Sequence, residues 1–357
     1  MTDKELESKT IDWLRFPMAF AVVLLHTGSQ GGNSNYPIYS TLCILLPNGL
    51  CRIAVPMFFL FSGYLFFRAI NRWDLRLIIN KISKRFKTIL LPYLLWNLLA
   101  AVLLFNYDNF RYKLNGLMPL SIKEALCRWQ GIRLFWDCYD GLPIDYPLWF
   151  VRNLFIFILC TPIIFLFIKY LKTWAIILLL ILDLLFGSFL EGLFFFTLGG
   201  FLSINGKSII SLSNTHTRTV LIGSLILLLL LSVFYRHNLT AYGLLRRLFV
   251  VTGSFAIFHL ASKGIETNKL RVNKLLSKSS FFIFAAHGII ILHDVSHYII
   301  YHILPLKGEA YHCVDLFVRP CLAVSICIAL LLIMEKLIPK TLGLLTGGRI
   351  FISNHPY

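Results

Sequence analysis

The sequence predicts an all-α protein, a polytopic transmembrane bundle of about ten helices with both termini in the cytoplasm. Three observations carry this prediction. Of the 357 residues, 57% are hydrophobic and only 14% are charged, whereas a soluble domain has roughly 25% charged residues. The mean hydropathy is +0.74. Apolar runs of about 20 residues, long enough to cross a bilayer, recur along the chain.

The apolar runs give the expected spans directly. Two of them, 173–187 and 190–203, are short, and Gly199-Gly200 in the second permits close helix packing. We expect one membrane domain over 1–357, with short cytoplasmic tails around a bundle at about 11–338. The expected spans, in chain order, are 11–28, 52–70, 88–106, 148–168, 173–187, 190–203, 218–235, 245–262, 279–300 and 314–338.

Charge orients these spans. The net charge of +17 lies in short clusters between apolar runs, which is typical of cytoplasmic membrane loops and gives no reason to expect a nucleic-acid partner. The loop at 70–87 is strongly basic and the loop at 263–278 is also basic, whereas 27–41 carries no charge and 107–147 is nearly balanced. The positive-inside rule therefore places both termini in the cytoplasm. Arg246-Arg247, which follow the seventh span, are an exception.

Processing and cysteine chemistry add little. No cleavable signal peptide is expected, because the first apolar run ends in His26 rather than in a small-residue cleavage site. The eight cysteines include no CxxC pair, so neither a zinc knuckle nor a redox motif is indicated. Cys127 and Cys138 share one loop, where they either pair in an oxidising compartment or remain free thiols.

The first span carries two ionisable residues on one face. Arg15 and His26 are eleven positions apart, which is three helical turns plus about 20°, and about 16 Å along the axis. Ionisable residues inside a span are costly and so are functional candidates. The alternatives are a snorkelling anchor for Arg15 and an interfacial polar residue for His26.

An ordered set of motifs resembles the membrane-bound acyltransferase 3 family, from about residue 11 to 338. The family has an Arg, ten residues and a His in its first helix, as Arg15 and His26 stand here. Phe284 stands where the family often has Tyr. The further stretches that carry the resemblance are Asp12, the run Arg52 to Leu65 (RIAVPMFFLFSGYL), Lys84-Arg85 with Ile89 to Tyr93, Pro147 to Val151, Phe194 to Gly200, and Leu276 to His287.

The resemblance implies an O-acyltransferase, and the residue types suit that chemistry. Moving an acyl group to a sugar hydroxyl needs a base, and a neutral histidine is suited to that task. We expect His26 to be the base and rank His287 second, its alternative being a polar contact inside the bundle. Arginine binds phosphate bidentately, so we assign Arg15 to donor binding or to a catalytic role in positioning the thioester, with Arg68 and Arg85 in support of donor binding. Their alternative is simple positive-inside charge.

Other candidates have weaker claims. Ser62-Gly63 lacks the G-x-S-x-G elbow of a serine nucleophile, so Ser62 is expected at a helix contact or along an acyl tunnel. Trp149 belongs to an interfacial aromatic belt or stacks on a sugar. His293, Asp294 and His297 have helical metal-ligand spacing, yet we expect no metal and interpret them as polar residues near the outer helix end.

The predicted function is therefore an O-acyltransferase of the bacterial inner membrane. The expected donor is acetyl-CoA and the expected acceptor is a sugar hydroxyl of a cell-surface polysaccharide or lipid-linked glycan, by family analogy. The alternative from another class is a transporter or flippase for lipid-linked glycan precursors, although no clear repeat or pair of broken helices is evident. A third possibility, a scaffold for glycan assembly, gives no reason for Arg15 and His26 to share a face. The sequence sets no oligomeric state.

Overall fold

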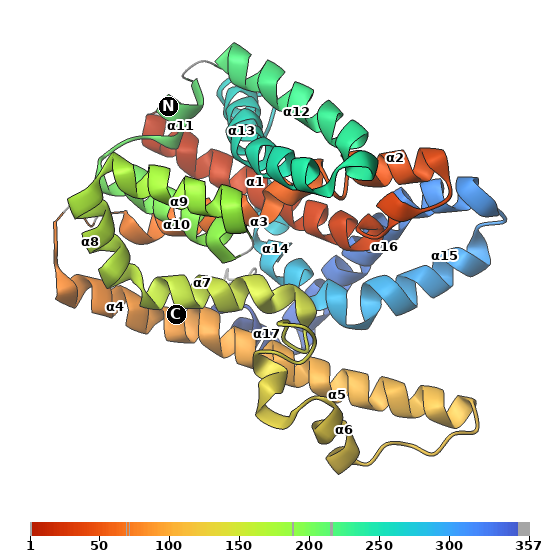
Figure 1. Ribbon diagram of the computed structural model, residues 1–357. Helices are drawn as coiled ribbons and strands as arrows, with labels where there is room; N and C mark the ends of the chain where they lie inside the picture. The colour runs from red at the N-terminus through yellow and green to blue at the C-terminus, as the bar shows by residue number, and fades with distance from the viewer. Residues whose placement is uncertain (1, 69, 71, 188, 215–216, 349–357) are drawn as a thin grey trace.

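The structure, a computed structural model, describes residues 2–68, 70, 72–187, 189–214 and 217–348. All regular secondary structure among the described residues is helical, apart from one isolated bridge between Tyr139 and Leu142. Figure 1 shows the helices gathered into one bundle. The helical segments, in chain order and with η for 3₁₀ and π turns, are α1 (Asp3–Gly28), η1 (Gly31–Asn33), α2 (Pro37–Leu45), η2 (Leu50–Ile53), α3 (Ala54–Phe67), α4 (Leu75–Arg85), η3 (Phe86–Leu90), α5 (Leu91–Leu114), α6 (Ile122–Arg128), η4 (Gly131–Phe135), η5 (Tyr146–Leu148), α7 (Trp149–Leu159), α8 (Thr161–Leu171), α9 (Thr173–Phe186), α10 (Phe189–Ile204), α11 (Ile209–Asn214), α12 (Thr217–His237), α13 (Leu239–Glu266), α14 (Lys274–Ala286), η6 (His287–Ser296), α15 (His297–Ile303), α16 (Gly308–Leu337) and α17 (Pro339–Leu345).

The helices begin where a polar residue interrupts the apolar pattern. The side chains of Asp74, Asn238 and Asn273 each accept the backbone N–H three residues further on, at 3.0, 3.0 and 3.2 Å. Ser121 and Glu124 form a reciprocal capping box at the start of α6. Each bond satisfies a backbone donor that the first helical turn leaves without a partner. Local sequence therefore sets where these helices start.

The protein is an all-α, multi-pass membrane protein. Among the described residues, six helical stretches are long and apolar enough to cross a membrane, or seven if one bent pair counts as a span. Every range expected to span overlaps a helix, but α9 and α10 are short, and α1, which carries the first expected span, is not among these stretches. The total of ten spans and the cytoplasmic orientation of both termini stay predictions. The six stretches are Pro37–Phe67, Leu75–Leu114, Thr217–Tyr235, Leu239–Glu266, Lys274–Ile303 and Gly308–Leu337.

The span expected at 148–168 is broken. It consists of α7 and α8, which meet at Cys160 with a bend of 64°. Pro162 lies in the first turn of α8. Because proline has no N–H to donate and its ring clashes with the preceding turn, a helix tends to end just before it.

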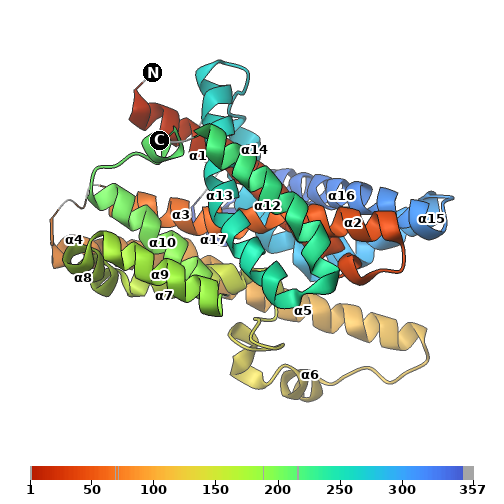
Figure 2. The ribbon, with the colours of Figure 1, turned by 45° about the horizontal axis from the view of Figure 1, so that its top comes forward.

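The third expected span, 88–106, is part of one long helical stretch that also includes most of the loop expected at 70–87. Leu75–Leu114 covers 40 residues through α4, η3 and α5, which is about 60 Å at 1.5 Å per residue. That length exceeds the roughly 30 Å hydrocarbon core. Figures 1 and 2 show the far end of α5 leaving the bundle together with α6. The far end of α5 and α6 therefore form an arm beside the bundle, whereas Tyr146 and Pro147 return to it.

The helices α3 and α10 touch backbone to backbone. A Cβ atom on Gly63 would lie 2.0 Å from the carbonyl oxygen of Phe196, and one on Gly199 would lie 2.1 Å from that of Leu60. Only glycine leaves room for such an approach, as in the small-residue interfaces of other membrane helices. The close packing expected from Gly199 is confirmed, and Gly63 is its partner position.

The charge exception at Arg246-Arg247 has a structural explanation. Arg247 donates a hydrogen bond to the carbonyl of Leu184, in the last turn of α9. Its guanidinium also lies against Gly187, where a Cβ atom would be 2.5 Å from Nη2. A cation at the C-terminal end of a helix satisfies a free carbonyl and favours the helix dipole. Arg247 therefore caps the C-terminal end of the short apolar helix α9.

Candidate active site

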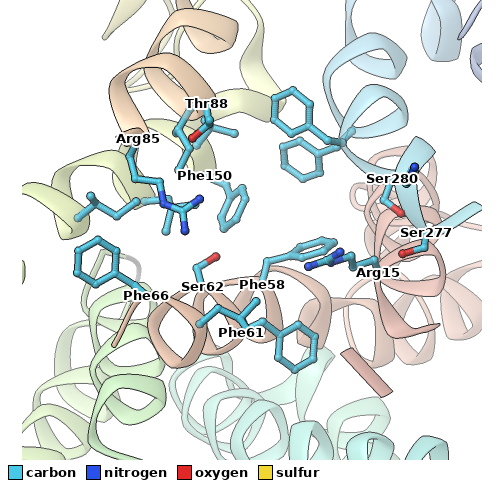
Figure 3. A pocket seen from close by; sticks show the side chains of 18 of the residues that line it. Arg15, Phe58, Phe61, Ser62, Phe66, Arg85, Thr88, Phe150, Ser277 and Ser280 are labelled. Atoms are coloured by element: carbon cyan, nitrogen blue, oxygen red, sulfur yellow. The ribbon is translucent and has the colours of Figure 1, made fainter. Parts of the chain in front are cut away.

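A cavity of about 470 Å³ lies between α1, α3, α7, α14 and the junction of α4 with η3. Its volume is in the range of small-molecule sites. Figure 3 shows Arg15 and Arg85 on opposite sides of it, with Ser62 between them. Its lining contains the basic residues Arg15, Arg85 and Lys278, the hydroxyl residues Ser62, Thr88, Ser277 and Ser280, and the phenylalanines Phe58, Phe61, Phe66, Phe150, Phe281 and Phe284.

The two arginines reach the cavity from different helices. Arg15 comes from α1, where its Nη1 lies 2.8 Å from Asp12 Oδ1, and both side chains are 40% exposed. Arg85 ends α4, just before the π turn η3. Arginine forks bind phosphate oxygens in bidentate fashion. With Lys278 on α14, the cavity offers three cationic side chains to a phosphorylated ligand.

The cavity contains some of the expected ligand-binding residues and leaves others out. Arg15, Arg85 and Ser62 line it, as expected for donor and acyl contacts. Arg68 does not line it: this residue is exposed at the end of α3, and its carbonyl accepts a hydrogen bond from Lys81 at 2.7 Å. Trp149 is also outside the lining, which its neighbour Phe150 reaches instead.

One face of α14 leads from the cavity deeper into the bundle. Ser277, Ser280 and Phe284 line the cavity, and His287 follows three residues later. Residues three or four apart lie on the same side of a helix. His287 is therefore expected on the continuation of the cavity-lining face, and its ring centroid is 6.3 Å from that of Phe284.

Three phenylalanines form a layer at this point, which we call the aromatic layer. It consists of Phe58, Phe150 and Phe284, and their ring centroids are 5.8, 6.3 and 5.5 Å apart, pair by pair. All three rings line the cavity, whereas His26 and His287 do not. Phe284 therefore connects the two regions, because it lines the basic cavity and its ring also lies next to His287.

The structure brings His26 and His287 together. His26 lies in the last turn of α1 and His287 opens the π turn η6, and their ring centroids are 5.4 Å apart with the planes inclined by 32°. His287 is fully buried, at 0% exposure, whereas His26 is partly exposed. π turns inside helices often occur at functional sites. From the sequence, His26 and His287 were two separate candidates for the base. Nothing in the sequence indicated that the two rings are neighbours.

A tyrosine that the sequence did not single out completes this cluster. The ring of Tyr146 meets His26 edge-on at a centroid distance of 4.9 Å, and its hydroxyl lies 3.1 Å from His293 Nε2. Gly288 makes this approach possible, because a Cβ atom there would lie 2.4 Å from Pro147 Cγ. Tyr146 directly precedes the motif Pro147 to Val151. This position next to a family motif was the one sign in the sequence that Tyr146 could lie near the site.

The end of α1 is fixed by an asparagine. Asn48 donates from Nδ2 to the carbonyl of Ser29, which directly follows α1, at 2.9 Å. Its Oδ1 accepts from Arg52 Nη2 at 3.1 Å, and its carbonyl accepts from the Tyr242 hydroxyl at 3.0 Å. These bonds connect α1, η2 and α13 close to His26. They restrict the backbone that carries the histidine.

Of the polar residues near the outer helix end, His293 and Asp294 have hydrogen-bond partners, whereas Nδ1 of His297 has none among the described residues. Asp294 accepts a hydrogen bond from the Tyr107 hydroxyl at 2.7 Å, and His293 is next to Tyr146. Within the described ranges, no group of three or more His, Cys, Asp or Glu side chains could hold a metal ion. Cys127 and Cys138 are both free thiols, the first exposed and the second buried.

Comparisons with known proteins identify the family of this chain. The sequence profile of the acyltransferase domain family matches residues 8–334. The chain is also 26% identical, over 363 aligned residues, to the succinoglycan biosynthesis protein ExoH of Rhizobium meliloti (strain 1021), an alignment that covers 96% of this chain and 92% of that protein. No solved structure matches. The family match extends over the cavity, the aromatic layer and both histidines, and the chain belongs to the acyltransferase 3 family of membrane acyltransferases.

Proposed function

We propose that this protein is an O-acyltransferase of the bacterial inner membrane. It transfers an acyl group, in our proposal acetyl, from acyl-CoA to a sugar hydroxyl of a cell-surface polysaccharide or lipid-linked glycan. The observation that carries the proposal is that a basic cavity lies next to the pair His26 and His287, with Phe284 both lining the cavity and packing near His287. The similarity to a succinoglycan biosynthesis protein supports a glycan acceptor.

The cavity suits the donor. Coenzyme A joins a phosphorylated nucleotide to a long, mostly uncharged arm that ends in the thioester. Arg15, Arg85 and Lys278 would hold its phosphates, because cations at this cavity attract anions and arginine orients them. Ser62 and the phenyl rings of the lining would contact the arm. The thioester then points toward the aromatic layer and the histidines beyond it.

The histidines supply the base. In the proposed reaction the sugar oxygen attacks the thioester carbonyl carbon, His26 takes the hydroxyl proton, and the carbon–sulfur bond breaks. A positioned base of this kind contributes on the order of 10²–10⁴ in rate. His26 is partly exposed and adjoins Tyr146. The acceptor would approach from that side, opposite to the donor.

The test is an acyl-transfer assay on purified protein. The protein in detergent is mixed with acetyl-CoA and with surface glycan extracted from a deletion strain, and released thiol is measured together with the mass of the glycan. Thiol release with a mass gain of one acetyl group is expected. A flippase would release no thiol, and this result from well-folded protein would contradict the proposal. Consumption of a different acyl-CoA would correct the acetyl assignment alone.

Matched arginine variants connect the activity to the cavity. Arg15→Ala and Arg85→Ala should weaken acetyl-CoA binding, measured by calorimetry. Arg76→Ala is the control, because Arg76 lies on the same helix as Arg85 but does not line the cavity. Equal affinities in all three variants would remove the cavity from the donor site.

A further inference from the structure

The two ring nitrogens of His287 are in different situations. Nδ1 lies 2.9 Å from the carbonyl oxygen of Ile283. A carbonyl can only accept a hydrogen bond, so Nδ1 carries the proton when the ring is neutral. Nε2 is then the nitrogen with the free lone pair. It is buried, and the described part of the chain offers it no hydrogen-bond partner.

The nearest candidate donor for Nε2 of His287 is a ring nitrogen of His26. The ring of His26 is 5.4 Å away between centroids. Two imidazoles joined by an N–H···N hydrogen bond have centroids roughly 5 Å apart, given a normal hydrogen-bond length. The observed separation is therefore close to that of a hydrogen-bonded pair of imidazoles. A buried polar atom without a partner is costly, which favours an orientation of the two rings that forms this bond.

The other neighbours of His26 do not offer a comparable acceptor. Its electrostatic neighbours are Arg52 from η2 and His287 and His293 from η6, while the Tyr146 ring packs against it from η5. Arg52 is a cation, and His293 is already 3.1 Å from the Tyr146 hydroxyl. A positive charge that forms on His26 during the reaction therefore finds its best acceptor in Nε2 of His287.

We infer that His287 is a positioning residue for His26: its Nε2 accepts a hydrogen bond from the far ring nitrogen of His26 and holds that ring toward the acceptor hydroxyl. This inference rests on the proposed function. The sugar oxygen forms a bond to the thioester carbon, its proton goes to His26, and the thiolate that leaves takes that proton from His26. His287 keeps its own Nδ1 proton throughout and touches neither substrate.

Two substitutions at this position separate the acceptor from the volume it fills. His287→Gln places an amide oxygen near the position of Nε2, whereas His287→Leu fills similar space without an acceptor. We expect the Leu variant to lose roughly 10–100-fold in kcat, the rate equivalent of one hydrogen bond to a charged group, with KM for acetyl-CoA nearly unchanged. The Gln variant should stay within about threefold of wild type, because it keeps the bond.

Two further readouts distinguish positioning from general structural support. Without an acceptor for its proton, the charged form of His26 is less favoured, so the acidic limb of the pH–rate profile should move to lower pH in the Leu variant but not in the Gln variant. In a double-mutant cycle, His287→Leu should have little further effect once His26 is Gln, because it acts through His26. Size-exclusion profiles and thermal unfolding of every variant check folding.

The outcomes are separable. If His287→Gln is as inactive as His287→Leu, then His287 takes the proton itself and the positioning role is wrong. A Leu variant that folds and transfers at the wild-type rate also overturns the inference. A wild-type protein that releases no thiol from any acyl-CoA would instead contradict the proposed function, before any variant is compared.

Discussion

Replacing Gly63 with alanine should separate two helices and impair transfer at a distance from any charged group. A Cβ atom at this position would lie 2.0 Å from the carbonyl oxygen of Phe196, whereas carbon and oxygen approach each other to roughly 3.3 Å. The neighbouring atoms belong to the backbone of α10 and cannot rotate away. The helix α3 must therefore shift by roughly 1 Å, or the packing must break.

The shift has two measurable consequences. Overpacking typically costs about 1–3 kcal/mol, of which alanine's better helix propensity returns up to about 1 kcal/mol. Because α3 carries Phe58 and Ser62 into the cavity, the same displacement misplaces the donor. A misplacement of about 1 Å can cost on the order of 10² in rate. We therefore expect a lower unfolding temperature and a larger loss in kcat.

The chain provides its own controls. Gly223 on α12 and Gly243 on α13 are helical glycines, and the described residues place no atom within 4 Å of where a Cβ atom would lie on either. Alanine at either site should leave transfer unchanged and should stabilise slightly, by up to about 1 kcal/mol. Thermal unfolding in detergent and the thiol-release assay are run on all three variants. A Gly63→Ala protein that unfolds and transfers like the two controls would refute the packing argument.

Further predictions concern the donor, the layer, the base and the topology. Acetyl-CoA affinity should fall as salt rises, and calorimetry of Arg85→Ala should show a weaker salt dependence than wild type, because a screened contact is lost. Phe284→Ala should admit longer acyl chains, seen as a raised ratio of butyryl to acetyl transfer; an unchanged ratio would place the acyl group elsewhere. His26→Gln should lose at least about 10² in transfer, and its residual rate should not fall toward acid pH as the wild-type rate does; near wild-type transfer would contradict the base assignment. Single cysteines at 107–147, but not at 70–87, should react with an impermeant reagent in spheroplasts, and the reverse pattern would invert the topology.

The sequence by itself determined the class of protein and most helix positions. Hydropathy acts locally, because a run of about 20 apolar residues has to form a helix in a bilayer whatever surrounds it. Helical periodicity is also local, so Arg15 and His26 could be placed on one face from their spacing alone. The expectation that Gly199 permits close packing was likewise available from residue size.

Tertiary structure decided which distant residues meet. His26 and His287 belong to opposite ends of the chain, and only the packing of α1 against α14 and η6 brings their rings to 5.4 Å. The arrangement of the helices likewise places Arg85 in the cavity lining and leaves Arg68 outside it. Which residues reach the cavity depends on long-range contacts, such as the close approach at Gly288. The hydrophobic effect is non-directional, so the pattern of apolar residues does not specify these contacts. The chemistry was therefore readable residue by residue from the sequence, but its assembly into one site was not.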